Sequence, residues 1–470
     1  MPVIYNRDTM AYDEDPTENI GSVTVSAKFL KNPFNFRYMV ASSDIYLTPL
    51  SHLCALVWGA IRLEAIHMWE EMFPGYPCWL ILSADKIRNK VEDLNRVCTQ
   101  NTVLQCFDVK QYYTNVPLQD LKTRLTDVAT RVYRRHTNRL TGGRTWVNND
   151  HETYLQVHEK STGRKHSFVR LTPQAAAQKR NSNRNTKTIS LQQAIKLATT
   201  IIFNTFFWLG NALLLQTIGI PMGANPSPAF ADLYLFSYEF EFVSRMWAHE
   251  DDRNILLRWF GVVARFQDDI LAAEAPYFLR AHDRQQYWST DHPHTSTFDE
   301  RDFPHRGIYP CQYLTIEKEQ ISSLKVIHQD VIIFRVETRS KFNRRVIKFH
   351  TKMYSKSDKL KSTGQSFVFY PDVDTFLSPK CTYGIVFSRA FAFARRCSQA
   401  ESFVEANVRL ISHLVMIKAY SLAKCLLRLR RFCIRRPHLY GAKSWRTHYY
   451  KASRQLFAMK NNPNADKRGQ

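Results

Sequence analysis

The sequence contains no C-x-x-C pair, although it has nine cysteines among its 470 residues. Zinc knuckles and zinc ribbons bind their metal through such pairs, so we expect no site of this kind. No secretory signal peptide is recognisable, and the odd number of cysteines argues against a disulfide framework. We therefore expect reduced thiols and an intracellular, reducing compartment, either the nucleus or the cytoplasm.

Acidic residues are scarce compared with basic ones, because 42 Asp and Glu stand against 65 Lys and Arg, a formal net charge of +23. A basic excess spread over the chain predicts a polyanionic partner, and it favours nucleic acid over a membrane surface. A basic surface that only maintains solubility is the alternative. The hydrophobic content of 44% and the aromatic content of 13% exclude a disordered chain, and the length predicts two or three lobes.

One long run lacks charged residues altogether, at residues 197–220 ("LATTIIFNTFFWLGNALLLQTIGI"). Its length suffices for a membrane span. Asn204, Asn211 and Gln216 make it less apolar than a spanning helix, and Pro221 follows directly. We therefore predict a buried helix and no membrane association.

Internal repeats are also absent. Two short strands around a Pro-Phe turn are expected from Ser22, with an apolar helix from about Leu47. Residues 102–117 predict a buried strand that ends at Asp108, and a helix follows near Pro117.

Two polar segments interrupt the apolar pattern. Residues 134–188 show no sustained apolar period, which predicts an inserted and partly mobile excursion. Residues 275–307 are rich in His and Asp, and they favour a solvated loop over a metal site. Between these segments, "GIPMGANPSPAFADLYLFSYEFEF" predicts a glycine-proline loop and an amphipathic helix. Residues 326–354 predict a β-hairpin, and the last hundred residues are helical and basic.

Two adjacent acids lie inside an otherwise apolar stretch, "VVARFQDDILA" at residues 262–272. The stretch predicts a short hairpin with Asp268 and Asp269 at its tip. Asp108 also ends an apolar strand, and neighbouring strands would bring it to Asp268. A lone Asp at a strand end also caps a turn, and this alternative stays open for either acid taken singly. Carboxylates that meet would repel each other and bind Mg²⁺, an arrangement that supports phosphoryl transfer.

Three motifs follow one another in the order of a known polymerase family. "FDVKQYYTNVP" resembles motif A of reverse transcriptases, "QTIGIPMGANPSPAFADLYLF" resembles motif B, and "ARFQDDIL" resembles motif C. The segments "DVKQYYTNVP", "GIPMGANPSPAFADLYLFSYEFEF" and "FLSPKCTYGIVFSRAFAFARRC" are most similar to Penelope-like elements and related retroelements. The resemblance covers roughly residues 22–435.

The resemblance implies an α+β fold, the right-hand polymerase, whose palm is an antiparallel sheet with packed helices. Its parts would be a loose lead-in (1–21), fingers (22–101), a palm (102–325) with insertions near 134–188 and 275–307, a hairpin between palm and thumb (326–358), and a basic helical thumb with a C-terminal tail (359–470).

The resemblance also assigns the catalytic groups. Asp108 and Asp268 would bind two Mg²⁺ ions, with Mn²⁺ as a substitute, together with the backbone carbonyl of Val109. Asp269 would support the second carboxylate. Tyr113 would lie under the incoming sugar, where its ring excludes a ribose 2′-hydroxyl and selects deoxynucleotides. A packed core tyrosine is the alternative for this residue.

Motif B implies contacts with the nascent base pair. Met222 and Gly223 would approach it closely, and Gln216 would form a hydrogen bond nearby. Ser227 and Pro228 would start the next helix as its cap and its first-turn residue.

Basic residues implied to contact phosphate have the solvated surface as their alternative. They are Arg37 and Lys31 at the triphosphate, Lys356 at the primer strand, and Arg428, Arg430 and Arg431 along the duplex backbone.

Motif C departs from the family pattern. Phe266 and Gln267 stand where a tyrosine and a small or apolar residue are more common, and both would lie beside the primer. Neither departure removes a metal ligand.

We therefore predict an RNA-directed DNA polymerase, a nucleotidyltransferase that extends the 3′-hydroxyl of a DNA or RNA primer with dNTPs on an RNA template. An RNA-dependent RNA polymerase is one alternative, and Tyr113 argues against it. A domesticated or degenerate copy that only binds nucleic acid is the other. The intact acids argue against that alternative, whereas Gln267 and the lack of a GIY-YIG nuclease motif keep it open.

Overall fold

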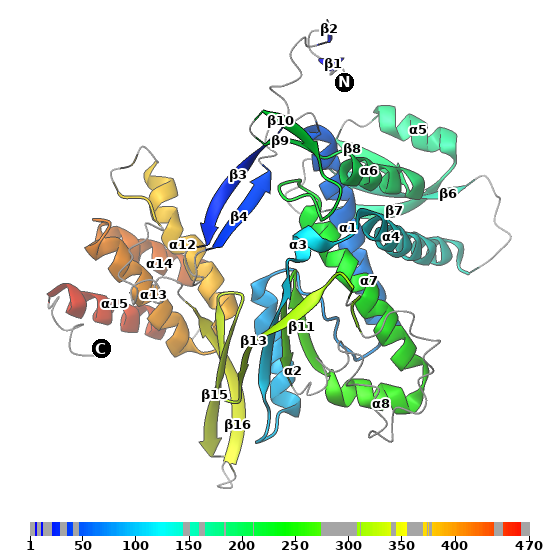
Figure 1. Cartoon of the computed structure of the whole chain (residues 1–470). Coiled ribbons are helices and arrows are strands. Elements are labelled where there is room, and N and C mark those ends of the chain that lie inside the picture. The colour runs from blue at the N-terminus through cyan, green and yellow to red at the C-terminus, as the bar shows by residue number, and fades with distance from the viewer. Residues whose placement is uncertain are drawn as a thin grey trace. The chain divides into compact units, whose positions relative to one another are not determined.

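The fold divides into two compact units. Unit 1 comprises Met1–Leu80, Asp108–Gly261 and Ala275–Glu317, and unit 2 comprises Ile81–Phe107, Val262–Glu274 and Lys318–Gln470. The computed structural model describes residues 5–6, 11–12, 21–28, 35–40, 47–143, 151–158, 165–182, 185–209, 211–273, 308–310, 312–339, 345–354, 370–373, 375, 378–436 and 445–461. Helices and antiparallel sheets occur in both units (Figure 1), which confirms the α+β class.

Unit 1 contains most of the first half of the chain. Its elements are β1 (Tyr5–Asn6), β2 (Ala11–Tyr12), β3 (Gly21–Lys28), β4 (Asn35–Val40), α1 (Thr48–Met72), α3 (Tyr112–Asn115), α4 (Leu118–Thr141), β6 (Glu152–His158), β7 (His166–Leu171), α5 (Pro173–Ser182), β8 (Thr186–Ser190), α6 (Leu191–Phe203), β9 (Phe206–Leu209), β10 (Ala212–Leu215), α7 (Ser227–Ala248) and α8 (Glu250–Trp259). The strands form the sheets β1-β2, β10-β9-β3-β4 and β7-β6-β8. The strands β3 and β4, the helix from Thr48 and the helix after Pro117 confirm the predictions for these segments.

The core of unit 1 lies among the helices α1, α4, α6 and α7, which pack on one another. An aromatic cluster fills the end of this core around Trp69, whose ring contacts Phe73, Tyr76, Trp79 and Phe236. The indole N–H of Trp69 donates to the Tyr76 carbonyl (3.2 Å), so its polar edge is satisfied inside the core.

Helix α7 is buried on every side from Ala229 to Phe240, so the predicted amphipathic pattern is wrong. Packing on α1, α4 and α8 covers all of its faces. Its acids are paired instead of solvated, and Asp232 accepts a hydrogen bond from Arg62 of α1 (2.6 Å). The predicted cap at Ser227 is also wrong, because Pro226 is the N-cap residue and the Ser227 hydroxyl donates to the Pro221 carbonyl.

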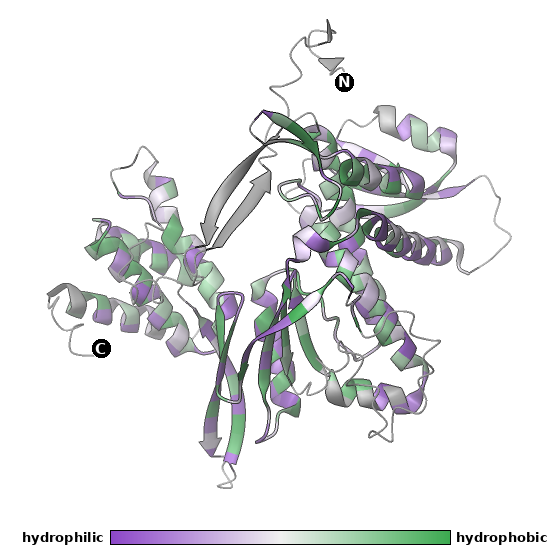
Figure 2. Ribbon diagram, viewed as in Figure 1, coloured by the Kyte–Doolittle hydropathy of each residue, from purple (hydrophilic) through white to green (hydrophobic). Residues whose placement is uncertain are grey.

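The uncharged run at 197–220 is not a single buried helix, so this prediction is wrong. Helix α6 ends at Phe203, with Asn204 as its C-cap, and the strands β9 and β10 follow as an antiparallel hairpin. Figure 2 shows the hydrophobic character of this hairpin, and the leucines 213–215 of β10 are exposed at its edge. None of the helices that the structure describes is both long and apolar enough to cross a membrane.

The polar segment 134–188, predicted as an inserted and partly mobile excursion, forms regular helix and strand structure in its described part. Helix α4 runs on to Thr141, and the strands β6, β7 and β8 form an antiparallel sheet. Tyr154 and Leu155 of β6 are buried beside α4, whereas the outer residues are polar. These strands bury too few apolar residues to show a clear period in the sequence.

A buried carboxylate joins this sheet to the helices. Glu64 of α1 is 8% exposed, and it accepts hydrogen bonds from Arg135 (3.0 Å) and His136 (2.8 Å) of α4 and from His166 of β7 (2.9 Å). Burial raises the pKa of the Glu64 carboxyl, but the hydrogen bonds from His136, His166 and Arg135 outweigh burial and hold the pKa far below its ordinary value. Glu64 is therefore a charged link between three elements.

Unit 2 holds two further sheets and the C-terminal helices. Its elements are η1 (Ala84–Lys86), α2 (Ile87–Val97), β11 (Val262–Phe266), β12 (Asp269–Ala273), β14 (Lys325–His328), β15 (Val331–Arg339), β16 (Arg345–Met353), α12 (Pro379–Arg396), α13 (Ala400–Met416), α14 (Leu422–Arg435) and α15 (Trp445–Asn461). The boundary between the units passes through β5 (Leu104–Lys110) and β13 (Thr315–Ser322). The sheets are β11-β12-β5-β13 and β14-β15-β16.

Helix α2 joins the two sheets of unit 2 in one apolar core. Its buried residues Ile87, Val91 and Leu94 pack with residues of β5, β11, β12, β14, β15 and β16. Asn95 fixes β16 to the helix, because its side-chain amide donates to the Phe349 carbonyl (2.8 Å) and its carbonyl accepts from the Phe349 N–H (2.6 Å). Strand β16 therefore has a fixed register against α2.

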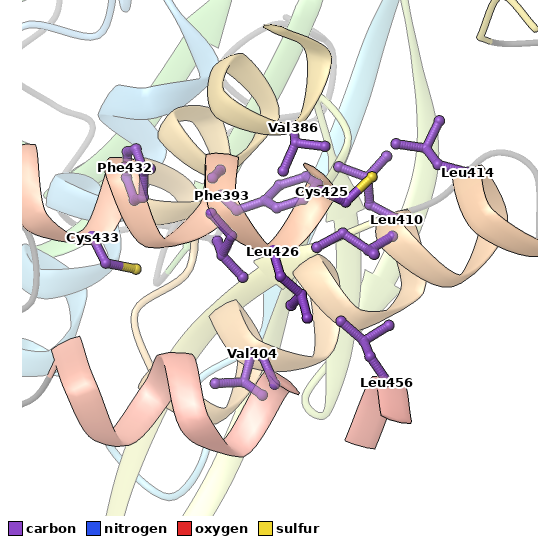
Figure 3. Close-up of a cluster of buried hydrophobic side chains, with 14 of the residues drawn as sticks. Val386, Phe393, Val404, Leu410, Leu414, Cys425, Leu426, Phe432, Cys433 and Leu456 are labelled. Atoms are coloured by element: carbon purple, nitrogen blue, oxygen red, sulfur yellow. The ribbon is translucent and has the colours of Figure 1, made fainter. Parts of the chain in front are cut away.

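The helices α12 to α15 form a second apolar core, which Figure 3 shows with Val386, Phe393, Leu410, Leu426 and Leu456 in contact around its centre. This confirms the helical prediction for the end of the chain. All eight cysteines in the described part of the chain are free thiols, and Cys381 at the start of α12 is the exposed one among them.

We expect Glu64→Gln to lower the unfolding free energy by about 3 kcal/mol, because it leaves three half-buried basic groups without their shared charge. The matched control is Glu71→Gln, which also removes an acid paired with Arg135 but at an exposed position, and which should cost less than about 1 kcal/mol. Thermal unfolding of the full chain measures both. Equal losses in the two variants would contradict the role assigned to Glu64.

Candidate active site

The β11–β12 hairpin carries the adjacent acids on a two-residue turn, as predicted. Phe266 pairs with Asp269 at the end of the ladder, so Gln267 and Asp268 form the turn. The strands below the turn are buried, whereas residues 266–269 are half-buried. The hairpin thus presents both carboxylates at the point where its apolar strands end.

Gln267 has a left-handed backbone conformation, with a φ of 54°. For a residue with a Cβ atom, this conformation lowers the stability of the fold by about 1 kcal/mol, because the Cβ crowds the carbonyl oxygen. Arg265 is fully buried and donates a hydrogen bond from its guanidinium to the Gln267 carbonyl (3.2 Å), which stabilises the turn. The predicted contacts of Phe266 and Gln267 with a primer stay predictions.

Within unit 2, the part of β5 that ends at Phe107 is the neighbour of β12, because the sheet order is β11-β12-β5-β13, and Asp108 follows Phe107 as the first residue of the next segment of unit 1. Asp108 is half-buried, and Val109 after it is buried. Strand β5 runs to Lys110, two residues beyond the predicted end at Asp108. Lys110 forms an ion pair with Glu317 of β13 (2.5 Å), two residues beyond the acid.

Cys106 lies on β5, in the part of the strand that belongs to unit 2. Burial raises the pKa of the Cys106 thiol far above its ordinary value, and the negative charges of Glu319 and Asp269 raise it further.

The carboxylates have the chemistry that Mg²⁺ prefers, since they supply hard oxygen donors. In the described part of the chain, however, no three His, Cys, Asp or Glu side chains are grouped so that they could hold a metal ion. The donors fit Mg²⁺ in kind but not in grouping. The predicted pair of Mg²⁺ ions therefore stays a prediction.

Two side chains at this hairpin, Arg265 and Gln329, are not predicted from the sequence. The Gln329 amide Nε2 donates a hydrogen bond to Asp269 Oδ2. Gln329 and Asp330 form a tight turn that separates β14 from β15, so the hairpin predicted at 326–354 is a three-stranded sheet. A Gln-Asp pair between apolar runs indicates a turn, but it does not identify the partner sixty residues away.

In unit 1, the glycine loop of motif B is held against Tyr113. The Tyr113 carbonyl accepts a hydrogen bond from the Ile220 N–H (2.7 Å). Gly219 has a φ of 89°, and a Cβ atom there would lie 2.5 Å from the Tyr113 carbonyl oxygen. Only glycine allows this approach. The Tyr113 ring is half-buried and packs edge-on against the buried Tyr112, so its contact with a sugar stays a prediction.

Three other predicted residues lie on this loop. The Gln216 amide donates to the carbonyls of Ile218 (3.0 Å) and Gly219 (2.9 Å), so it shapes the loop. Met222 is half-buried, and Gly223 is exposed with a φ of 100°. The structure brings Gln216, Met222 and Gly223 together, and their contacts with a base pair stay predictions.

The predicted phosphate contacts fall in separate places. Arg37 lies on β4, opposite Ser26 of β3. Lys31 and Lys356 lie outside the described residues.

Helix α14 carries the remaining predicted phosphate contacts. Its face with Leu426, Leu429 and Phe432 is buried, whereas Arg430 and Arg431 are exposed and Arg428 is half-buried. The helix has five basic residues and no acidic one, and among the described residues these three arginines form no ion pair. Its outer face is thus available to a polyanion.

No protein-family model and no curated protein matches the sequence. Among solved structures, the chain is similar to telomerase from Candida albicans in complex with the TWJ fragment of telomeric RNA, at 12% identity, with a TM-score of 0.46, over 94% of this chain and 60% of that one. It is also similar to telomerase from Candida tropicalis with the same type of RNA fragment (14% identity, TM-score 0.42, 92% and 61%) and without it (13%, 0.44, 94% and 63%). The chain spans about 60% of the length of the first telomerase chain. These values are too low to assign it to a family.

We expect Gln267→Gly to raise the unfolding free energy by about 0.5–1 kcal/mol, because glycine adopts the left-handed conformation without strain. The control is Gln267→Ala, which removes the polar side chain but keeps the Cβ atom and should leave stability unchanged. Thermal unfolding of both variants measures the difference. A similar gain in both would show that the side chain, and not the backbone, is the source of strain.

Burial lowers the pKa of His328 from 6.5 to about 4. The unfolded chain therefore takes up this proton at a higher pH than the folded chain, and the folded state loses stability as pH falls from about 6.5 towards about 4, by about 2 kcal/mol at pH 5. We expect His328→Leu to lack this loss when melting temperatures are compared at neutral pH and at about pH 5. A variant of the exposed His52 should keep the wild-type dependence, and an unchanged dependence in His328→Leu would contradict the assignment.

Proposed function

We propose that the chain is a nucleic-acid polymerase of the reverse-transcriptase type, which extends a primer 3′-hydroxyl with dNTPs on an RNA template. The observation that carries the proposal is the strand order. Within unit 2, the part of β5 that ends at Phe107 is the neighbour of the strand that begins with Asp269, and Asp268 precedes that strand in a tight turn. Asp108 follows Phe107 directly in the sequence. Carboxylates on adjacent strands are the arrangement that phosphoryl transfer needs.

The proposal includes a requirement for Mg²⁺, or for Mn²⁺ in its place, because carboxylate oxygens are the ligands these ions prefer. Asp108, Asp268, Asp269 and the carbonyl of Val109 are the proposed donors. Since the described acids are not grouped around an ion, cation dependence has to be measured directly.

The choice of dNTPs is proposed from Tyr113. Two backbone contacts tie it to the glycine loop, the hydrogen bond from Ile220 and the close approach of Gly219. These contacts fix the backbone of Tyr113, whose ring packs edge-on against Tyr112. The ring would meet a ribose 2′-hydroxyl, whereas it would leave room for deoxyribose. The Tyr113 ring therefore favours a DNA polymerase over an RNA polymerase.

The nucleic-acid partners are proposed from helix α14. Arg428, Arg430 and Arg431 would contact the phosphates of a primer–template duplex, which predicts binding that weakens with salt and depends little on sequence. A retroelement origin, with similarity to Penelope-like elements, is proposed from the sequence segments alone.

A protein that binds nucleic acid without extending it is the second candidate. Two observations favour it: no metal-binding group is found among the described residues, and Gln267 occupies a strained position between the acids and Phe266. The basic face of α14 serves this candidate equally well.

The test is primer extension by the full chain on an RNA template, with dNTPs and separately with rNTPs, in Mg²⁺, in Mn²⁺ and with a chelator. We expect extension with dNTPs that needs the cation, and we expect Asp268→Ala/Asp269→Ala to reduce it by at least about 10³-fold. Binding of the primer–template should change by less than about threefold, because the arginines of α14 are unchanged.

The matched control is Asp127→Asn, which removes an acid of an exposed ion pair with Arg131 and should extend the primer like wild type. Extension that survives in the double variant would contradict the proposed site. Binding without extension in wild type would support the second candidate, and extension with rNTPs alone would support an RNA polymerase.

A further inference from the structure

The tip of the β14–β15 hairpin touches an acid of the candidate active site. His328 pairs with Val331 across the tip, so Gln329 and Asp330 form a two-residue turn. The Gln329 amide Nε2 donates a hydrogen bond to Asp269 Oδ2. Both residues belong to unit 2, and β14 packs beside β12.

Both residues of this turn, Gln329 and Asp330, have a backbone conformation that is unfavourable for residues with a Cβ atom. Gln329 has a φ of 48° and Asp330 a φ of 61°, and hairpin turns of this kind favour glycine and asparagine. The left-handed backbone conformation at this position does not favour glutamine. Its side chain is what distinguishes it, because the amide reaches the Asp269 carboxylate.

The surroundings of the turn keep the amide in place. Val326 and Val331, on either side of it, are fully buried in the apolar core that also contains Leu271 of β12. Gln320 of β13 clamps β14, since its side chain accepts from the Ile327 N–H (2.8 Å) and donates to the Ile327 carbonyl (3.2 Å).

A further hydrogen bond fixes the other half of the turn. The Asp330 carbonyl accepts from the N–H of Tyr354, which follows β16 (2.8 Å). The amide of Gln329 is therefore presented by a rigid support.

We propose that Gln329 is a positioning residue, which fixes the orientation of the Asp269 carboxylate for the polymerase reaction. The inference rests on the proposed function. A neutral amide suits the task because it holds the carboxylate without neutralising its charge, as a lysine or arginine would. Without the amide, the Asp269 side chain would populate other rotamers, and the reacting groups would be aligned for a smaller fraction of the time.

The test compares variants within this one turn. Gln329→Asn keeps an amide and tolerates the left-handed backbone better than glutamine, but it is one methylene too short to reach Asp269. Gln329→Glu keeps the length and replaces the donor with a negative charge. The control is Asp330→Asn, which changes the neighbouring left-handed residue and leaves the amide of Gln329 intact.

We expect kcat of primer extension to fall about 10-fold in Gln329→Asn and about 30-fold or more in Gln329→Glu, with KM for dNTP and primer–template affinity unchanged. Asp330→Asn should stay within about twofold of wild type. A wild-type kcat in Gln329→Asn, or an equal loss in Asp330→Asn, would overturn the proposal.

A second measurement does not depend on activity. In a double-mutant cycle of Gln329→Asn and Asp269→Asn, followed by thermal unfolding, we expect the two shifts in melting temperature to be non-additive by about 2 °C. Additive shifts would overturn the proposal. If wild type extends no primer, the proposed function fails, and non-additive shifts would still support the contact.

Discussion

Two adjacent carboxylates in a tight turn set the constraint on which the candidate site depends. Asp268 and Asp269 repel each other where the buried strands β11 and β12 end. The turn that joins these strands contains no glycine, so Gln267 adopts the left-handed backbone conformation. Hydrogen bonds from two other side chains hold the turn and the acid that follows it. The buried guanidinium of Arg265 holds the Gln267 carbonyl, and the amide of Gln329 holds Asp269. The strain of this site lies in the backbone of Gln267.

Unit 1 also has acids in a buried environment, because helix α7 is buried on every side and carries acidic residues. Each of these acids needs a partner inside the protein. Arg62 supplies one to Asp232 at 2.6 Å, Tyr309 supplies one to Glu239 at 2.6 Å, and Glu64 is surrounded by basic side chains in the same way. Such pairs contribute little net stability, but they penalise any packing that leaves one member alone. They therefore specify how the helices of unit 1 pack.

The sequence predicts best where the local pattern and the tertiary environment agree. The hairpin at 262–273 was predictable because apolar runs flank a polar pair, and α1 was predictable from its long apolar period. The sheet within 134–188 was not, because its strands bury few side chains. The hairpin at the end of 197–220 was hidden by uniform hydrophobicity, which does not distinguish a helix from a strand.

The residues of the candidate site likewise divide into those that the sequence predicts and those that it does not. The acids follow from motifs and strand ends. The roles of Arg265 and Gln329 do not, since each depends on which atom the fold brings to it, and neither residue type signals this in the sequence. Gln267 stood out in the sequence by its side chain, whereas in the structure its backbone conformation is the unusual feature.

The free thiols of the chain differ widely in chemical reactivity. Burial raises the pKa of Cys425 and Cys433 to about 12, so these thiols stay protonated and covered at neutral pH. The thiolate is the reactive form, and Cys381 is the exposed cysteine among the eight described ones. Among the eight described cysteines, a maleimide dye would therefore attach first at Cys381, at the start of α12. The C-terminal helices thus carry a natural position for a fluorescent reporter, and no cysteine of their apolar core needs to be replaced to use it.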